Sequence, residues 1–322
     1  MFKAGIRLIA ATVLCGMASL ASAAGYPERP ITLVTPFPAG GATDALARVL
    51  ADSMGKTLGQ TLVVENRAGA ATTIGASHAA RATPDGYTIL LATNSTLVTN
   101  RFLFKKLPYD PDGFTPIGMI GIGPMVLLTA KKHHYKTLAD VVKAAKDAPE
   151  PLSIASFGSG TSSHLAAEYL QDLAGIKLLH VPFKGSTGAL PQLINGDVDL
   201  FFDMVSTGMP QVDNGKVDVV GITSQKRLST RPDIPTIGEQ GYPEFNLTAW
   251  FTLVAPPNTP ADITTTLNKA LKAALEDKAV RQRILEMGIE PADGSPEALI
   301  KQIDTEKPII EALVKRADIV VQ

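Results

Sequence analysis

The chain has 322 residues, of which 45% are apolar and 19% charged, and its formal net charge is −1. A chain of this length and apolar content can bury the cores of two ordinary domains. The small share of charged residues argues against a disordered chain. The near-zero net charge argues against a nucleic acid or an anionic membrane surface as partner.

The first 23 residues have the pattern of a secretory signal peptide. Lys3 and Arg7 precede the short apolar run LIAATVLCGMASL, and small residues follow up to Ala23. Cleavage after Ala23 or nearby, rather than a buried N-terminal helix, is therefore predicted, and the mature chain is expected to be exported. Cys15, the single cysteine, would be removed, so the mature protein is expected to lack thiol chemistry. Leu14 before it argues against a lipoprotein.

The mature chain begins with a β-α-β-α-β pattern. Apolar runs at 31–35, 61–65 and 87–93 predict buried strands. Apolar residues between Leu46 and Leu58 recur at helical spacing, and 72–86 reads as a helix ended by a Pro-Asp-Gly turn. This order is typical of a parallel sheet with helices on its faces.

A second α/β series follows near residue 125. Its predicted strands are 125–130, 152–158, 177–183, 198–203 and 217–223. Helices are expected at 137–149, 162–175 and 188–197. The chain therefore contains two α/β units.

The C-terminal part has a different organisation. Residues 249–260 are expected to form a strand followed by a proline-rich turn. Two amphipathic helices are predicted at 261–287 and 295–316. Because these helices cannot bury their apolar faces alone, we expect them to pack on the first unit. The chain would then cross between the units near 118–125 and 243–250, in two strand-like crossings.

Two crossings of this kind make a hinge above a cleft, where small ligands usually bind. The predicted domains are a signal peptide at 1–23, domain 1 at 24–122 plus 250–322, and domain 2 at 123–249. The expected fold class is α/β.

Common catalytic signatures are missing. The sequence contains no G-x-S-x-G, no GxGxxG and no H-E-x-x-H, and His133 and His134 are read as a solvated turn rather than a metal pair. An exported hydrolase using Ser163, His164 and Asp203 is the competing interpretation. It is disfavoured because adjacent helical residues do not face each other as nucleophile and base. No cofactor or metal is predicted.

Four strand-to-helix junctions are rich in glycine and small hydroxyl residues: 36–44, 92–96, 157–163 and 183–188. In an open α/β sheet, ligands bind in the crevice beyond the carboxyl ends of the strands. Exposed main-chain N–H groups and helix N-termini there suit a carboxylate. The alternative is that βα turns need glycine for their own geometry.

The mature chain resembles, almost end to end, the Bug family of periplasmic solute receptors of tripartite tricarboxylate transporter systems. The resemblance rests on seven segments in the same order: YPERPITLVTPFPAGGATDALAR, VVENRAGAATTIGA, PDGYTILLAT, LPYDPDGFTPIG, ASFGSGTSSHLAAE, HVPFKGSTGALPQLINGDVDLFFD and DKAVRQRILEMGIEP. It implies a type II periplasmic binding protein with a Venus-flytrap fold that closes on a small carboxylate. A membrane permease would be its partner, and the receptor would be a monomer and not an enzyme. A receptor that feeds a signalling system remains an alternative.

The resemblance also implies which residues contact the ligand. The first loop would contribute Phe37, Ala39, Gly40, Gly41 and Asp44, and the second Thr93, Asn94 and Ser95. The facing domain would contribute Ser159, Gly160, Thr161, Ser162 and His164, with Lys184, Gly185 and Asp203 deeper in the cleft.

Three of these residues have an alternative role. Asp44 could be a helix-capping group. Asp203 could receive a ligand ammonium group or bond to hinge backbone, and Lys184 could bind a second carboxylate or extend into solvent. Pro308 stands where the family usually has an aromatic residue, which concerns the packing of the tail, and Trp250 is expected near the hinge.

Overall fold

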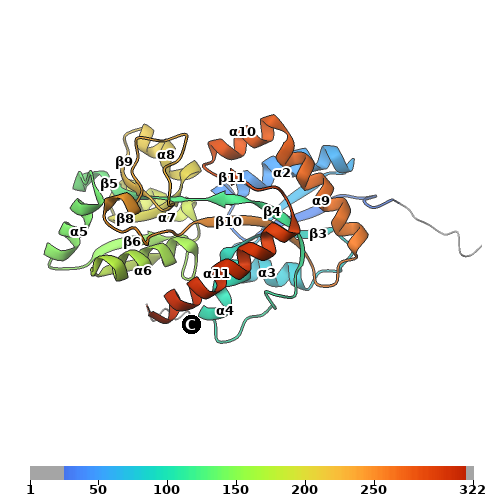
Figure 1. Cartoon of the computed structure of the whole chain (residues 1–322), viewed down its shortest axis with the longest axis horizontal. Helices are drawn as coiled ribbons and strands as arrows, with labels where there is room; N and C mark the ends of the chain where they lie inside the picture. Colours follow the sequence, from blue (N-terminus) through green and yellow to red (C-terminus); the bar gives the residue numbers. More distant parts are fainter. Residues whose placement is uncertain (1–24, 317–322) are drawn as a thin grey trace, which may run out of the picture.

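The computed structural model describes residues 25–316, so the predicted signal peptide lies outside the described residues. Two β-sheets, each flanked by helices, form two lobes side by side (Figure 1). The two-domain α/β architecture expected from the sequence is confirmed. Within residues 25–316, no helix has the length and apolar character needed to cross a bilayer.

The first lobe contains a six-stranded mixed sheet in the order β11-β4-β10-β3-β1-β2. Its strands are β1 (Ile31–Thr35), β2 (Leu62–Asn66), β3 (Thr88–Thr93), β4 (Thr115–Gly123), β10 (Ala249–Ala255) and β11 (Glu290–Pro291). The strand β1 pairs in parallel with β2 and β3, whereas β10 is antiparallel to β3 and β4. The helices between the strands are α2 (Ala42–Leu58), α3 (Thr73–Ala80), the π-helix η2 (Ser95–Thr99) and α4 (Asn100–Leu103).

The second lobe contains a five-stranded sheet in the order β7-β6-β8-β5-β9. Its strands are β5 (Met125–Ala130), β6 (Leu152–Ser156), β7 (Leu178–Pro182), β8 (Leu200–Met204) and β9 (Val217–Ile222). Its helices are α5 (Leu138–Asp147), α6 (Ser162–Ala174), α7 (Ser186–Asn195) and α8 (Val205–Asp213), with 3-10 turns η3 (Lys131–His133) and η4 (Gly238–Gln240). In both lobes the first loop leads from a parallel strand into a long helix.

Two crossings join the lobes. The first is direct, because β4 ends at Gly123 and β5 begins at Met125. The second was expected to be strand-like, but residues 241–248 form turns and irregular backbone before β10 begins. Pro243 lies in this segment and cannot donate to a sheet. We propose domain boundaries at 24–122 plus 250–322 and at 123–249.

The tail packs on the first lobe, but as three helices instead of the two predicted. A continuous helix over 261–287 is wrong: α9 (Ala261–Glu276) and α10 (Lys278–Glu286) are separate. The break is at Asp277, whose backbone is extended and whose carboxylate accepts hydrogen bonds from the N–H groups of Ala279 and Val280, as an N-cap does.

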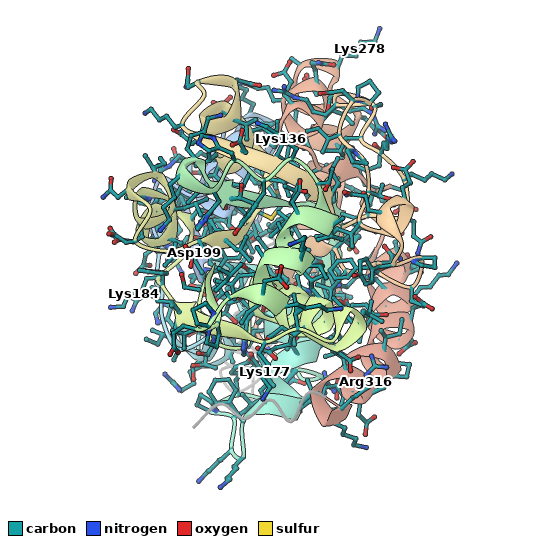
Figure 2. All side chains as sticks on the ribbon, turned by 90° about the vertical axis from the view of Figure 1, so that its left-hand side faces the viewer. Lys136, Lys177, Lys184, Asp199, Lys278 and Arg316 are labelled. Carbon is teal, nitrogen blue, oxygen red and sulfur yellow. The ribbon has the colours of Figure 1, made fainter. Side chains whose placement is uncertain are left out.

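The last helix, α11 (Pro296–Arg316), packs on β4 and η2 and also reaches the second lobe (Figure 1). At its end, Arg316 Nε lies 2.8 Å from Asp172 Oδ2 of α6. Arg316 is visible beside the second lobe in Figure 2. Trp250, at the start of β10, is completely buried and donates its indole N–H to Glu306 of α11. The tail therefore supports the hinge as well as the first lobe.

Two local expectations were wrong. The helix predicted at 72–86 ends at Ala80, and turns occupy the rest of that segment. His133 is not in a solvated turn: its Nε2 lies 2.6 Å from Asp199 Oδ1, and its ring stacks on Tyr135. The pattern of neighbouring histidines could not reveal Asp199, which lies 66 positions away.

Candidate functional site

The first loop is held by a carboxylate from its own helix. Gly40 has φ +81°, and its N–H donates to Asp44 Oδ2 over 2.9 Å. Arg48 Nε and Nη2 each lie 3.0 Å from an oxygen of the same carboxylate, and Asn66 Nδ2 donates to Asp44 Oδ1 over 3.0 Å. Asn66 also donates to Thr35 Oγ1 over 2.8 Å, which joins the ends of β1 and β2.

These contacts define the state of Asp44. Burial acts to raise the pKa of this carboxyl, but hydrogen bonds from Arg48, Gly40 and Asn66 lower it below its usual range. The ionised carboxylate therefore anchors the loop to the first turn of α2.

The corresponding loop of the second lobe uses an imidazole in the same place. Gly160 has φ +82°, and its N–H donates to His164 Nδ1 over 3.0 Å. Because Nδ1 accepts this bond, His164 carries its proton on Nε2, which lies 3.4 Å from Glu168 Oε1. The ring stacks on His180 at 3.8 Å, and His180 Nε2 lies 2.6 Å from Ser156 Oγ. Burial and the neighbouring His164 lower the pKa of His180 to about 4.

A cavity lies between the lobes. Its walls come from the first loop, the end of β3, the second-lobe loops and strand β10, namely Phe37, Pro38, 41–43, Thr93, Asn94, Phe157, Ser162, 185–187, Met204, Ala249 and Phe251. None of these described lining residues has an ionisable side chain.

Three helices begin at this cavity. The first intrahelical bonds of α2, α6 and α7 are donated by Ala45, Leu165 and Gly188. The preceding N–H groups have no partner within their helices, and each helix has the positive end of its dipole there. Because 42–43, Ser162 and 186–187 line the cavity, it offers main-chain donors from both lobes.

A second cavity adjoins the first and shares Phe37, Pro38, Phe157 and Gly185 with it. It lies under the segment 68–72 and is also lined by Ser159, Thr161 and Lys184. Lys184 is exposed and points outward at the edge of the molecule in Figure 2.

The structure places the predicted site residues in three groups. Those that line the first cavity are Phe37, Gly41, Thr93, Asn94, Ser162 and Gly185, and those that line only the second are Ser159, Thr161 and Lys184. Ala39, Gly40, Asp44, Ser95, Gly160, His164 and Asp203 line neither cavity. Of this last group, Asp44 and His164 hold the N–H groups of Gly40 and Gly160, so those two N–H groups already have acceptors.

Asp203 lies behind the cavity wall. It is completely buried, and its Oδ1 accepts hydrogen bonds from Ser186 Oγ over 2.6 Å and from the N–H of Met204 over 2.8 Å. Burial raises the pKa of Asp203 to about 7, although bonds from Ser186, Thr207 and Met204 act to lower it. Ser186 and Met204 are themselves lining residues.

The contacts do not assemble a serine-hydrolase triad. Ser163 Oγ donates to the carbonyl of Phe202 over 2.7 Å, and His164 Nδ1 accepts from Gly160. Asp203 bonds to Ser186. Each of the three groups therefore has a structural partner other than the next member of the proposed triad.

Sequence reasoning missed the apolar side of the cavity and its support. Met204, Ala249 and Phe251 line it, and Glu306 contacts Asn94 from behind. An apolar residue at the end of a buried strand looks the same whether it faces core or cavity. A usable signal was present in the loops, where Gly40–Asp44 and Gly160–His164 have the same four-residue spacing.

Comparison with known proteins identifies the family. The model of the tripartite tricarboxylate transporter family receptor, TctC, matches residues 46–318. The periplasmic binding protein BugD is 38% identical, with a TM-score of 0.88 over 92% of this chain and 100% of that one. A Rhodopseudomonas palustris protein with adipate is 34% identical, with a TM-score of 0.89 over 92% and 99% of the two chains.

MatC of the same organism, with bound malate, is 35% identical, with a TM-score of 0.85 over 90% of this chain and 100% of that one. These similarities span nearly the whole described chain. The protein therefore belongs to the tripartite tricarboxylate transporter family of receptors.

Proposed function

We propose that the protein is a periplasmic receptor that captures a small carboxylate between its lobes and delivers it to the membrane permease of a tripartite tricarboxylate transporter. The observation that carries the proposal is the meeting of three helix N-termini, from α2, α6 and α7, at one cavity lined by both lobes. Such termini bind anions through main-chain N–H groups without a formal cation. The adipate and malate complexes of relatives agree with this ligand class.

The lining residues 41–43, Ser162 and 186–187 would supply the donors, while Phe37, Phe157 and Phe251 would cover the apolar part of the ligand. Because the donors come from two lobes, the ligand stabilises the closed arrangement more than an open one. Closure then presents a surface to the permease. The receptor acts as a monomer, and no bond of the ligand is broken.

The binding test is isothermal titration of the mature protein with mono-, di- and tricarboxylates and acidic amino acids. We expect saturable binding of at least one of them. If none binds, the proposal is wrong.

A steric variant tests whether the lobes must meet at the cavity. Gly185 has φ +76°, and a Cβ there would lie 3.1 Å from Pro38 Cδ of the other lobe. Gly185→Ala should weaken the best ligand of the panel about tenfold or more, since the added carbon separates the lobes. Gly215→Ala is the matched control: its φ is +68° and a Cβ there meets nothing within 4 Å. Equal affinity in the two variants would remove this contact from the mechanism.

A further inference from the structure

One wall of the cavity, at the end of β3, includes Asn94, whose side-chain acceptor Oδ1 has no donor among residues 25–316. We infer that the ligand has, besides its carboxylate, a hydrogen-bond donor in the form of a hydroxyl or ammonium group, and that Asn94 selects for it. This inference rests on the proposed function, because it concerns the same cavity. It adds a requirement that carboxylate binding alone does not impose.

The orientation of the Asn94 amide is determined by its neighbours. Asn94 is completely buried and lines the cavity. Its Nδ2 lies 3.2 Å from Glu306 Oε1 and 3.4 Å from the carbonyl oxygen of Thr248. A carboxylate and a carbonyl accept hydrogen bonds and do not donate them, so turning the amide over would place its oxygen against two acceptors. Oδ1 is therefore the amide atom that points away from Glu306 and Thr248.

Glu306 of α11 is a positioning residue for this amide. Its other oxygen, Oε2, accepts the indole N–H of Trp250, which can only donate. With one oxygen occupied by Trp250, the other remains an acceptor for Asn94 Nδ2. Glu306 thus fixes the amide from the side away from the ligand, at a place 212 positions further along the chain.

The acceptor on Asn94 is buried and, among residues 25–316, no side chain or main chain donates to it. The neighbouring hydroxyl of Thr93 is also buried without a partner in this part of the chain, and it lines the same cavity. A buried acceptor left without a donor costs free energy, so a ligand that donates here gains affinity over one that does not. A ligand carboxylate cannot satisfy Asn94 Oδ1, because both groups only accept, whereas the Thr93 hydroxyl can either donate or accept.

The two ends of the site are therefore complementary to different groups. Helix N-termini at 41–43, Ser162 and 186–187 suit the carboxylate, and Asn94 with Thr93 suits a donor. Ser186 strengthens this polarity, because its hydroxyl proton is directed to Asp203 Oδ1 and its oxygen can only accept from the ligand.

Matched ligand pairs test the inference on the unaltered mature protein. Within each series the acids share a carbon skeleton and differ in whether they carry a hydroxyl group, an ammonium group or neither. The series are malate, aspartate and succinate; lactate, alanine and propionate; and 3-hydroxybutyrate and butyrate. Titration at pH about 8, above the pKa of about 7 to which burial raises Glu306, keeps that carboxyl ionised. We expect the hydroxy or amino acid to bind at least about tenfold more tightly than its partner in one or more series.

The outcomes separate the two proposals. If acids without a donor bind as tightly as, or more tightly than, their partners in every series, the inference about Asn94 is overturned while carboxylate binding stands. If no acid binds, the proposed function fails too. The hydroxyl and amino members of each series show which donor the wall prefers.

Two variants locate the selection. Asn94→Leu keeps the branched shape, with a somewhat larger volume, but removes the acceptor, so the ratio of affinities within a pair should fall about tenfold, mainly through weaker binding of the donor-bearing acid. Glu306→Gln brings an NH2 group that lets Asn94 turn over, so the ratio should fall there as well. Glu311→Gln, on the exposed side of the same helix beside Lys315, should leave the ratio unchanged. A ratio that stays the same in both Asn94→Leu and Glu306→Gln overturns the inference.

Discussion

The loops after β1 and β6 have similar backbone where their helices begin, but different anchors. In each loop a glycine with φ near +80° lies two residues before the first helical residue. Its N–H donates to a side chain four positions further along the chain. In the first lobe this side chain is the carboxylate of Asp44, bonded to Arg48 and Asn66. In the second it is the neutral imidazole of His164, stacked on His180.

The difference shows that loop shape and anchor chemistry are separate choices. An ionised carboxylate with a lowered pKa keeps its acceptors when the solution turns acidic. An imidazole keeps its Nδ1 acceptor only while it is neutral, because His⁺ donates from both nitrogens. We therefore expect the two halves of the site to differ in sensitivity to mutation and to pH.

The largest effect is expected from Asp44→Ala. The change removes a buried acceptor shared by Gly40, Arg48 and Asn66. It leaves the N–H of Gly40 without its partner, whereas Asn66 keeps Thr35 and Phe37 and Arg48 can turn to solvent. The free energy of unfolding in urea should fall by about 2–4 kcal/mol. Asp52→Ala is the control, because Asp52 lies on the same helix in an exposed pair with Lys56 and should matter little. Similar losses in the two variants would mean that Asp44 is an ordinary surface charge.

Acid should act through the second lobe. His180 has a pKa of about 4 in the folded protein, whereas its usual value is 6.5. Between these pH values the unfolded chain binds a proton that the native protein does not, so stability falls as the pH falls. The loss between pH 6.5 and 4 should be on the order of 1–3 kcal/mol larger in the natural chain than in His180→Gln.

The comparison with His180→Gln is needed because other groups act in the opposite direction. Burial raises the pKa values of Asp203 and Glu306 to about 7, so their contributions are lost as the pH rises through that value. These contributions are the same in both proteins and cancel in the difference. Parallel pH profiles for the two proteins would show that His180 titrates normally.

A smaller effect is expected at His164, where the acceptor can be retained. His164→Ala leaves the N–H of Gly160 without its partner and should cost about 1–2 kcal/mol in the free energy of unfolding. His164→Asn offers an oxygen in nearly the same place and should restore part of that loss. Amide hydrogen exchange at Gly160 should quicken in the alanine variant and not in the asparagine one. Equal exchange in both would contradict the role of Nδ1.

Much of the fold could be predicted from local patterns. Apolar runs mark the strands that flank both loops, and the glycines at 40, 41 and 160 mark where each helix begins. Strand ends and helix starts are local features of the sequence. The loops after β1 and β6 could therefore be predicted to lie at the cavity. The break at Asp277 was missed because the apolar stripe of Leu271 and Leu275 continues to Val280 and Ile284, and the end of α3 at Ala80 was missed because the Pro-Asp-Gly turn was taken as the first stop signal.

The support of the site was harder to predict, since it depends on contacts between distant segments. Glu306 reaches Asn94 and Trp250 only because α11 lies under the hinge. Asp203 was read as facing either a ligand or the hinge, and its bond to Ser186 could not be seen before the two lay side by side. A buried charged side chain needs a hydrogen-bonding partner, but the sequence alone does not identify that partner.

The smallest effect is expected from a substitution of Arg48, which tests whether the ion pair or the hydrogen bonds of Asp44 hold the first loop. Its side chain is 57% exposed, and without it Asp44 still accepts from Gly40 and Asn66. Arg48→Gln should therefore lower the free energy of unfolding by less than about a third of the Asp44→Ala loss. The difference from the natural chain should shrink further at about 1 M salt, where exposed charges are screened beyond about 3 Å. If Arg48→Gln matches Asp44→Ala at high salt, the ion pair rather than the Gly40 and Asn66 bonds anchors the first lobe, and the parallel with His164 is lost.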